Sequence, residues 1–297
     1  YDRAEEKVAN IIKAAMIDGE DPKNIAAQIM VLKHITGLAK VKVAIEDTLE
    51  LPVDSLRKIG YDILRMKVRS ALLKTTTEIA ADEGVRTSLR FGDSCLIVGE
   101  VRSLEAKALY EAMRIGALAN VVAGTIHGAS PYGVFDRVVN DLQVPATSFK
   151  ATDAIVVCNP IKSADGMHSW KRVVQIAEVR KHWQKDPLEE QGFVDLMKYD
   201  VNKDELVASD ALINGESEIV KAVASNVKGW IGNWDAVYDN ILLRAKIKQE
   251  LVNVAEKSKL PELVEAKFNS LSNAAFYFIS DAVREEIGLP SSERVFP

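Results

Sequence analysis

The residues Cys95-Leu96-Ile97-Val98-Gly99-Glu100-Val101-Arg102 are the most informative stretch of this sequence, and Gly124-Thr125-Ile126-His127 ends a similar pattern further along. The first stretch begins with a short run of apolar residues, and the second stretch follows such a run. Apolar runs without alternating polar residues are typical of strands buried on both faces of a parallel sheet. Residues 103–115 carry apolar side chains at helical spacing and end at Gly116, a residue suited to a left-handed helix cap. The order strand, helix, strand therefore predicts a parallel α/β sheet.

The composition is that of a soluble globular protein with room for a sizeable core. The chain has 297 residues, 47% of them hydrophobic and 27% charged, and a formal net charge of -5. This charge argues against a global electrostatic attraction to nucleic acid, so no stable nucleic-acid complex is expected. The sequence has no apolar run of the roughly 20 residues that a membrane helix needs and no signal peptide, which predicts a cytoplasmic protein.

The remaining patterns predict three parts. Residues 1–40 contain two amphipathic helices, and residues 41–212 form the α/β core, with an antiparallel edge made by strands near residues 172–179, 193–199 and 205–208. Residues 213–297 form a helical C-terminal extension. The two cysteines, Cys95 and Cys158, both lie in predicted strands, where they are expected to be buried thiols rather than ligands or a disulfide.

A basic stretch from Leu56 to Lys74 fits a helix with one positive face. Two interpretations stay open, a solvated or subunit-facing surface and a surface for nucleic acid or an acidic partner. The cations on this predicted face are Arg57, Lys58, Arg65, Lys67, Arg69 and Lys74.

Polar residues follow three predicted strands at the same edge of the sheet. The first strand is followed by Glu46, Asp47 and Glu50. The second is followed by Glu100 and Arg102, and the third by His127. Open α/β sheets bind ligands at this edge, and acids there can hold Mg²⁺ and orient water for attack on a γ-phosphate. For any single acid, a helix cap or a surface salt bridge is the competing interpretation. The four histidines have no spacing typical of a zinc site.

Four ordered motifs together resemble a known family. They are an acidic box at Glu46-Asp47-Thr48-Leu49-Glu50, an arginine in Leu89-Arg90, a Walker B motif ending in Glu100-Val101-Arg102, and a histidine box at Gly124-Thr125-Ile126-His127. Over roughly residues 41–179 the chain resembles the type II/IV secretion and pilus or archaellum assembly motor ATPases. Within this family it resembles archaeal members. The resemblance implies a RecA-like P-loop NTPase core with a mostly parallel sheet.

The resemblance also implies an activity and partners. Members form hexameric rings that hydrolyse ATP with Mg²⁺ and drive a membrane platform protein to assemble a pilus or extrude a substrate. For this chain it implies a homo-hexamer, a platform-protein partner, and a cytoplasmic location, peripheral at the inner face of the cell membrane.

When the family's motif residues are matched to this sequence one by one, the resemblance implies a role for each acid. Glu100 matches the Walker B acid, expected to act on Mg²⁺ and on the attacking water. Glu46 and Glu50 match the two acids of the acidic box, and Glu50 is the residue we expect to polarise the water. The division of labour between Glu50 and Glu100 stays open.

Other matched positions concern the phosphates. His127 matches the histidine that senses the γ-phosphate. Arg90 and Arg102 match arginines that stabilise phosphoryl-transfer charge, in the same subunit or across a subunit boundary. Asp47 and Thr125 are expected to contribute to nucleotide binding.

One part of the family's pattern is absent from the sequence. A P-loop needs Gly-x-x-x-x-Gly-Lys-Ser/Thr, yet none of the sixteen glycines is followed by lysine, and Gly19-Glu20-Asp21-Pro22-Lys23-Asn24 stands where the loop is expected. Gly92 also stands where members often have a second arginine. Because the chain opens at Tyr1 and not at Met, we expect that residues carrying the loop are missing from it. The alternatives are a degenerate, non-hydrolysing ring subunit and a DNA-translocating relative.

Overall fold

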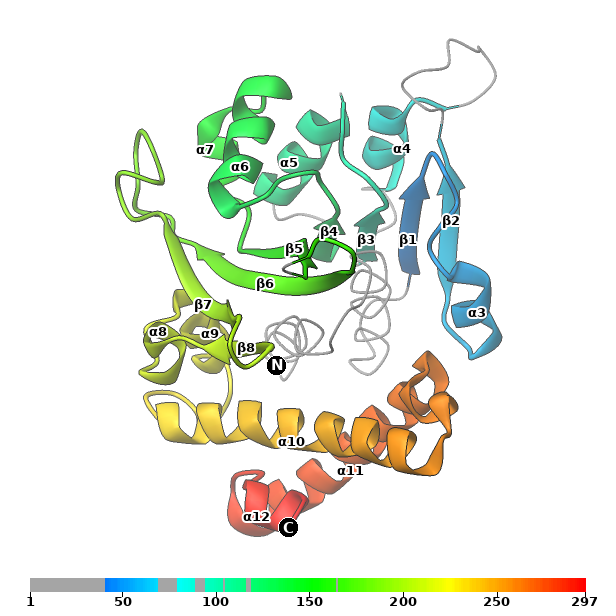
Figure 1. Cartoon of the computed structure of the whole chain (residues 1–297), viewed down its shortest axis with the longest axis vertical. Coiled ribbons are helices and arrows are strands. Elements are labelled where there is room, and N and C mark those ends of the chain that lie inside the picture. The colour runs from blue at the N-terminus through cyan, green and yellow to red at the C-terminus, as the bar shows by residue number, and fades with distance from the viewer. Residues whose placement is uncertain (1–40, 69–78, 89–93, 104, 116–118, 164) are drawn as a thin grey trace.

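The protein combines a parallel sheet, an antiparallel sheet and a helical C-terminal part (Figure 1). The computed structural model describes residues 41–68, 79–88, 94–103, 105–115, 119–163 and 165–297. The helices predicted in residues 1–40 lie outside this range. The predicted mixed α/β class is confirmed.

Four parallel strands form the first sheet, in the order β2-β1-β3-β4. Their bounds are β1 Val41–Glu46, β2 Ile63–Lys67, β3 Ser94–Val98 and β4 Ala119–Gly124. In the register of the central pairs, Ile45 lies beside Val98 and Val98 beside Gly124. Since all four strands run the same way, their carboxyl ends meet at one edge.

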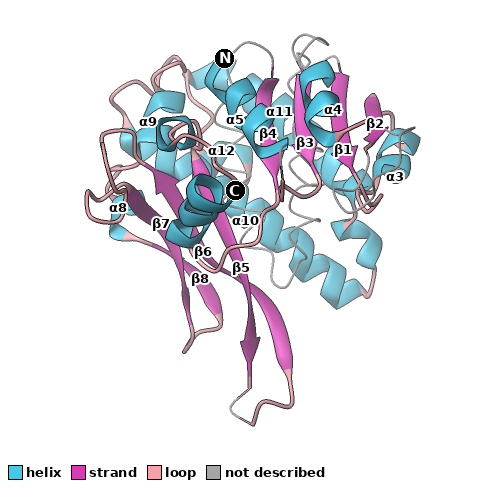
Figure 2. Ribbon diagram, turned by 90° about the horizontal axis from the view of Figure 1, so that it is seen from above, coloured by secondary structure: helices cyan, strands magenta, loops and turns pink. Residues whose placement is uncertain are grey.

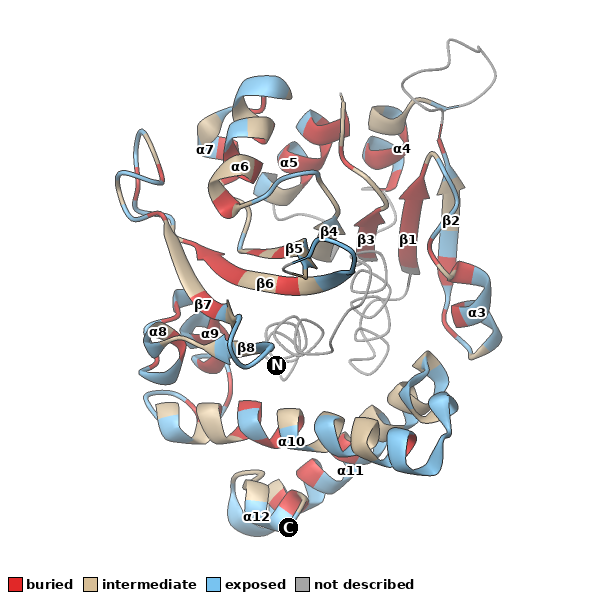
Figure 3. Cartoon of the chain, in the orientation of Figure 1, coloured by how far each residue is buried: buried red, intermediate tan, exposed pale blue. Residues whose placement is uncertain are grey.

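Helices bury both faces of this sheet. Val43 and Leu96 pack in one cluster with residues of α4 (Ala81–Ser88) and α5 (Glu105–Ile115). Ala44 and Ile97 pack on the other side in a cluster that includes Leu56 of α3 (Val53–Lys58). The central strands are buried on both faces (Figure 3), which explains their continuous apolar runs and confirms the predicted unit of β3, α5 and β4.

The helix predicted from Leu56 to Lys74 is wrong. The stretch contains the end of α3, a turn at Gly60 with φ of +97°, and strand β2. Arg57 donates to the Ile63 carbonyl oxygen at 2.9 and 2.6 Å, and Arg65 pairs with Asp54 at 2.9 Å. These cations serve local contacts and do not line one helical face, while Arg69 and Lys74 lie outside the described residues.

The predicted antiparallel strands do not form an edge of the parallel sheet, because they pair with one another and with β5 in a second sheet of order β5-β6-β7-β8. Their bounds are β5 Ala154–Lys162, β6 Ser169–Val179, β7 Phe193–Asp200 and β8 Glu205–Ala208. The hairpin of β5 and β6 extends away from the body of the molecule (Figure 2). Cys95 in β3 is a buried free thiol, as predicted, whereas the free thiol Cys158 in β5 is only partly buried.

An aromatic cluster joins this part of the chain to the parallel sheet's core. Ser130 caps α6 (Pro131–Asp136) by accepting from the Gly133 N–H at 3.0 Å, and the π-helical turn η3 (Arg137–Asp141) and α7 (Ala146–Phe149) follow. The Phe135 ring lies 5.1 Å from Phe149 and 5.6 Å from Trp183, both edge-on. The same buried cluster holds Leu96 and Val157, so one core spans both sheets.

The C-terminal part is helical, as predicted. It contains α8 (Asp210–Ile213), α9 (Glu218–Ala224), α10 (Trp234–Ser258), η4 (Pro261–Val264), α11 (Ala266–Ile287) and α12 (Ser292–Val295). The Tyr61 hydroxyl donates to the Ser270 hydroxyl at 2.9 Å, so α11 contacts the turn before β2. Among the described helices, none combines the length and apolar character needed to span a membrane.

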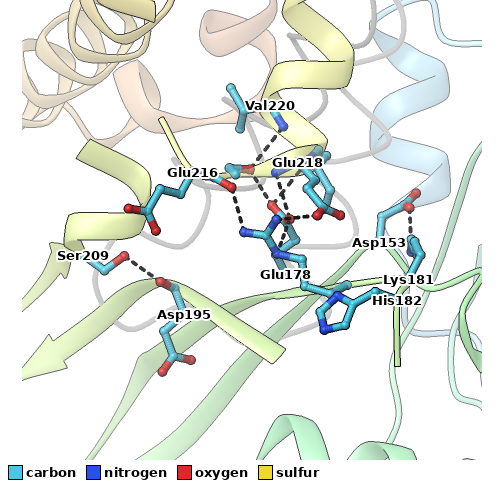
Figure 4. Close-up of polar contacts among 12 residues, drawn as sticks. Asp153, Glu178, Lys181, His182, Asp195, Ser209, Glu216, Glu218 and Val220 are labelled. Carbon is cyan, nitrogen blue, oxygen red and sulfur yellow. Dashed lines mark hydrogen bonds and ion pairs between the residues drawn. The ribbon is translucent and has the colours of Figure 1, made fainter. Parts of the chain in front are cut away.

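The buried carboxylate of Glu178 links the helical part to the antiparallel sheet (Figure 4). Glu178 near the end of β6 has no exposed surface, and it accepts hydrogen bonds from the Ser217 hydroxyl and from the Glu218 N–H at 2.9 Å, at the first turn of α9. Arg180 lies 3.1 Å from Glu178 and 2.8 Å from Glu218. The carboxylate is therefore ionically paired and also satisfies helix-terminal donors.

We expect Glu178→Gln to destabilise the protein by about 2–4 kcal/mol, because the change leaves Arg180 without its buried counter-charge and turns an amide donor toward other donors. Urea unfolding at pH 7 measures the effect. Glu205→Gln, an exposed change on β8, is the control and should alter stability by less than about 0.5 kcal/mol. Equal unfolding midpoints for the two variants would contradict this role of Glu178.

Candidate functional site

Four of the predicted site residues meet at the carboxyl edge of the parallel sheet. Asp47 follows β1, Glu100 and Arg102 follow β3, and His127 follows β4. Arg102 pairs with Asp47 through Nη2, and its Nη1 lies 3.5 Å from Glu100 Oε2. Glu100 Oε1 lies 3.2 Å from His127 Nε2. Three strands thus contribute to one continuous chain of charged and polar contacts, which we call the edge cluster.

The members of the edge cluster differ in exposure. The His127 side chain is 80% exposed, while Glu100 and Asp47 are 28% and 16% exposed. Because Arg102 lies between the two carboxylates, it offsets their mutual repulsion. The cluster therefore presents an imidazole and one face of a carboxylate to solvent, where an incoming ligand can reach them.

Glu46 lies deeper than the other acids. Its side chain is almost fully buried, and its Oε1 accepts from the backbone N–H groups of Glu50 at 2.8 Å and Leu51 at 2.7 Å. Arg65 Nε lies 4.0 Å from its other oxygen. Glu46 therefore shapes the turn after β1, and Glu50 lies on that turn as an exposed residue.

The close approach of β3 to β1 depends on a glycine. A Cβ at Gly99 would lie 3.1 Å from Glu46 Cγ, tighter than ordinary contact, and the Gly99 N–H donates to the Ile45 carbonyl oxygen at 2.8 Å. The Thr125 hydroxyl donates to the Gly99 carbonyl oxygen, and the Thr125 carbonyl oxygen accepts from the Val101 N–H at 2.8 Å. Thr125 therefore holds the loops after β3 and β4 together.

Sequence reasoning gave Glu105 no role at the edge. This carboxylate is buried, and it accepts from the N–H groups of Arg102 at 2.6 Å and Ser103 at 2.8 Å, and from the Ser103 hydroxyl. It caps the start of α5 and orders the backbone of Arg102. An acid in the first turn of a predicted helix, three residues after Arg102, is the sequence signal that could have revealed this role.

Two further predictions concern Arg90 and a metal ion at Glu100. Arg90 lies outside the described residues. For the metal prediction at Glu100, the part of the chain that the structure describes contains no group of three or more His, Cys, Asp or Glu side chains placed to hold a metal ion. A Mg²⁺ ion at Glu100 would therefore need further oxygen ligands from phosphate or water, which is common for this ion.

Comparison with solved structures finds distant similarities, including similarities to two ATPases. No protein-family model and no curated protein matches this sequence. The ATPase DotB of Legionella pneumophila is similar over 57% of this chain and 48% of its own, with a TM-score of 0.39 and 15% identity. The VirB11 ATPase of the Brucella suis type IV secretion system is similar over 54% of this chain and 46% of its own, with a TM-score of 0.37 and 17% identity. The chain thus spans about half the length of each, and similarity this low does not assign a function.

We expect Glu105→Ala to lower stability by about 1–3 kcal/mol, because two backbone N–H groups and a hydroxyl at the start of α5 lose their acceptor. Chemical denaturation measures the change. Glu111→Ala on the same helix is the matched control, since its exposed pair with Arg86 at 3.2 Å should contribute no more than about 1 kcal/mol. A Glu105 variant as stable as the control would show that the cap is dispensable.

Proposed function

We propose that the edge cluster acts on a Mg²⁺-bound nucleoside triphosphate and that the protein is a motor ATPase of the type II/IV secretion and pilus or archaellum assembly class. One observation carries the proposal: Asp47, Arg102, Glu100 and His127 form one chain of contacts at the carboxyl edge of a parallel sheet. This edge is the usual ligand site of such sheets. The ordered motifs of the sequence, on which the family resemblance rests, supply the same residues.

The residues of the cluster have the chemistry that this reaction needs. Glu100 offers carboxylate oxygens to a divalent cation or accepts a proton from water, and the exposed imidazole of His127 can donate to a terminal phosphate. Arg102 supplies positive charge near the site where charge develops on the transferred phosphoryl group. Bound Mg²⁺ would neutralise phosphate charge there.

Glu50 is the second candidate for activating water. Its N–H is held by Glu46, and its side chain is exposed beside the same edge. Glu46 itself is an unsuitable base because its Oε1 already accepts two backbone hydrogen bonds. We therefore assign Glu46 to positioning the acidic box, and Glu100 and Glu50 to the water and the metal ion.

A second function is favoured by the absence of a Gly-x-x-x-x-Gly-Lys sequence from the 297 residues. The backbone N–H groups of such a loop cradle phosphates at a helix N-terminus, and the motif that forms it does not occur within residues 1–297. The second candidate is therefore a ring subunit that keeps the edge cluster but does not hydrolyse ATP. The DNA-translocating alternative is not retained, because the helical basic face on which it depended does not form.

The larger assembly is part of the proposal. A homo-hexamer, a membrane platform protein as partner, and a location at the inner face of the cell membrane follow from the family resemblance. This arrangement would place nucleotide binding and release by the chain next to the membrane platform protein that the ATPase drives.

Glu100→Gln should reduce Mg²⁺-dependent ATP turnover by about 100-fold or more, because an amide neither accepts the proton of the attacking water nor carries the charge that Mg²⁺ prefers. Steady-state phosphate release by the full natural protein measures the rate. Glu205→Gln on the distant strand β8 is the control and should keep the wild-type rate. Equal background rates in the wild type and Glu100→Gln would end the hydrolysis proposal.

Titration with a fluorescent ATP analogue separates the two candidates. A hydrolysing motor should bind the analogue saturably with Mg²⁺, and His127→Ala should weaken that binding if the imidazole contacts the terminal phosphate. A folded, oligomeric protein with no saturable binding would favour the non-hydrolysing subunit.

A further inference from the structure

A buried guanidinium in the helical part has no acidic partner. Arg244 of α10 is only 8% exposed, and no Asp or Glu carboxylate of the described residues lies within ion-pair distance of it. Its Nε donates to Asn240 Oδ1 at 2.8 Å, and its Nη1 donates to the Tyr277 hydroxyl at 3.1 Å. A buried charge is costly unless it is paired. The arrangement therefore calls for a counter-ion.

Two aromatic rings lie against the guanidinium of Arg244. The Arg244 Cζ atom lies 4.3 Å from the centroid of the Phe276 ring and 5.3 Å from that of Tyr277, both on α11. A guanidinium carries its N–H donors in a planar fork. The described partners use two of these donors, so further in-plane donors on Nη1 and Nη2 are left for a planar acceptor.

A second buried polar group lines the same hollow. The Ser280 side chain is 3% exposed, and its hydroxyl oxygen is buried without a hydrogen-bond partner. The hollow lies between α10, α11 and the segment before α10, and its wall also holds Lys228 and Arg284, of which Arg284 is paired with Asp281. Two deeply buried groups with unused hydrogen-bonding capacity thus face one space, in a wall whose charged members are cations.

The hollow suits the head of a small anion. Its volume is about 20 Å³, which exceeds the roughly 10–15 Å³ that one water needs. A planar carboxylate matches the planar fork of Arg244 and can accept from Ser280 as well. A tetrahedral phosphate is bulkier than a carboxylate and fits a hollow of about 20 Å³ less well.

We infer that this hollow, which we call the Arg244 pocket, binds a carboxylate group. The ligand is a small carboxylate or the carboxylate of a polypeptide, and Arg244 pairs with it in its own plane while Ser280 donates to it. The pocket is separate from the edge cluster, and it does not depend on the proposed nucleotide chemistry.

Thermal unfolding in sodium acetate tests the pocket, with sodium chloride at equal ionic strength as the reference. Acetate should raise the Tm of the wild type saturably, by about 2 °C or more, because a ligand that binds only the folded state stabilises it. Arg244→Gln should weaken the apparent affinity at least about tenfold. Arg294→Gln, which removes an exposed arginine paired with Glu286 at 2.6 Å, should respond like the wild type.

Ser280→Ala is the second variant, because removing a buried hydroxyl that lacks a partner should leave the fold intact. It should need a several-fold higher acetate concentration for the same rise in Tm. The inference is overturned if acetate acts no differently from chloride, or if neither Arg244→Gln nor Ser280→Ala changes the response. A saturable effect of inorganic phosphate with none of acetate would also overturn the assignment to carboxylates.

A matched pair of compounds distinguishes the two sources of the carboxylate. N-acetylglycine resembles the end of a polypeptide chain, and N-acetylglycinamide lacks only the charge. Binding of N-acetylglycine more tightly than acetate supports a polypeptide ligand, and equal binding supports a small carboxylate. Binding of the amide as tightly as the acid would contradict recognition by charge and so overturn the inference.

Discussion

The parallel pairing of β1, β3 and β4 is the constraint on which the edge cluster depends. Because Ile45, Val98 and Gly124 lie side by side in the register, the residues that follow them emerge at the same level of the sheet. Gly99 lets the chain after β3 pass close to Glu46, where a Cβ atom would make a contact of 3.1 Å, tighter than ordinary packing. A change of register would separate Asp47, Glu100 and His127, since each belongs to a different strand.

Buried charged groups have two different roles in this protein. Glu46, Glu105 and Glu178 each accept backbone N–H groups at a turn or a helix start, so each orders the chain around it. Each of these carboxylates is held by groups of the fold itself. Arg244 differs, because its neighbours use only part of its donors and none of the described ones neutralises its charge. This contrast separates structural ion pairs from a pocket with capacity for a ligand.

Local patterns predicted much of the architecture. Continuous apolar runs marked β3 and β4, and helical spacing marked α5 and the C-terminal helices, since each signal lies within a few neighbouring residues. Strand β2 was mistaken for helix because the apolar residues of 56–74 also fit a period near 3.6. What makes residues 63–67 a strand is pairing with β1, as in the alignment of Lys42 with Ile63, and that contact is not local.

The sequence by itself determined the α/β class, the order of most elements, and the polar residues that follow the strands, because periodicity and turn chemistry are short-range properties. Only the tertiary structure decided which of those residues touch, that Glu46 is enclosed while His127 is exposed, and that Arg102 lies between two acids. It also decided the surroundings of Arg244, a residue to which the sequence analysis gave no role. Burial and charge pairing arise from contacts between distant segments, and those contacts form only when the chain is packed.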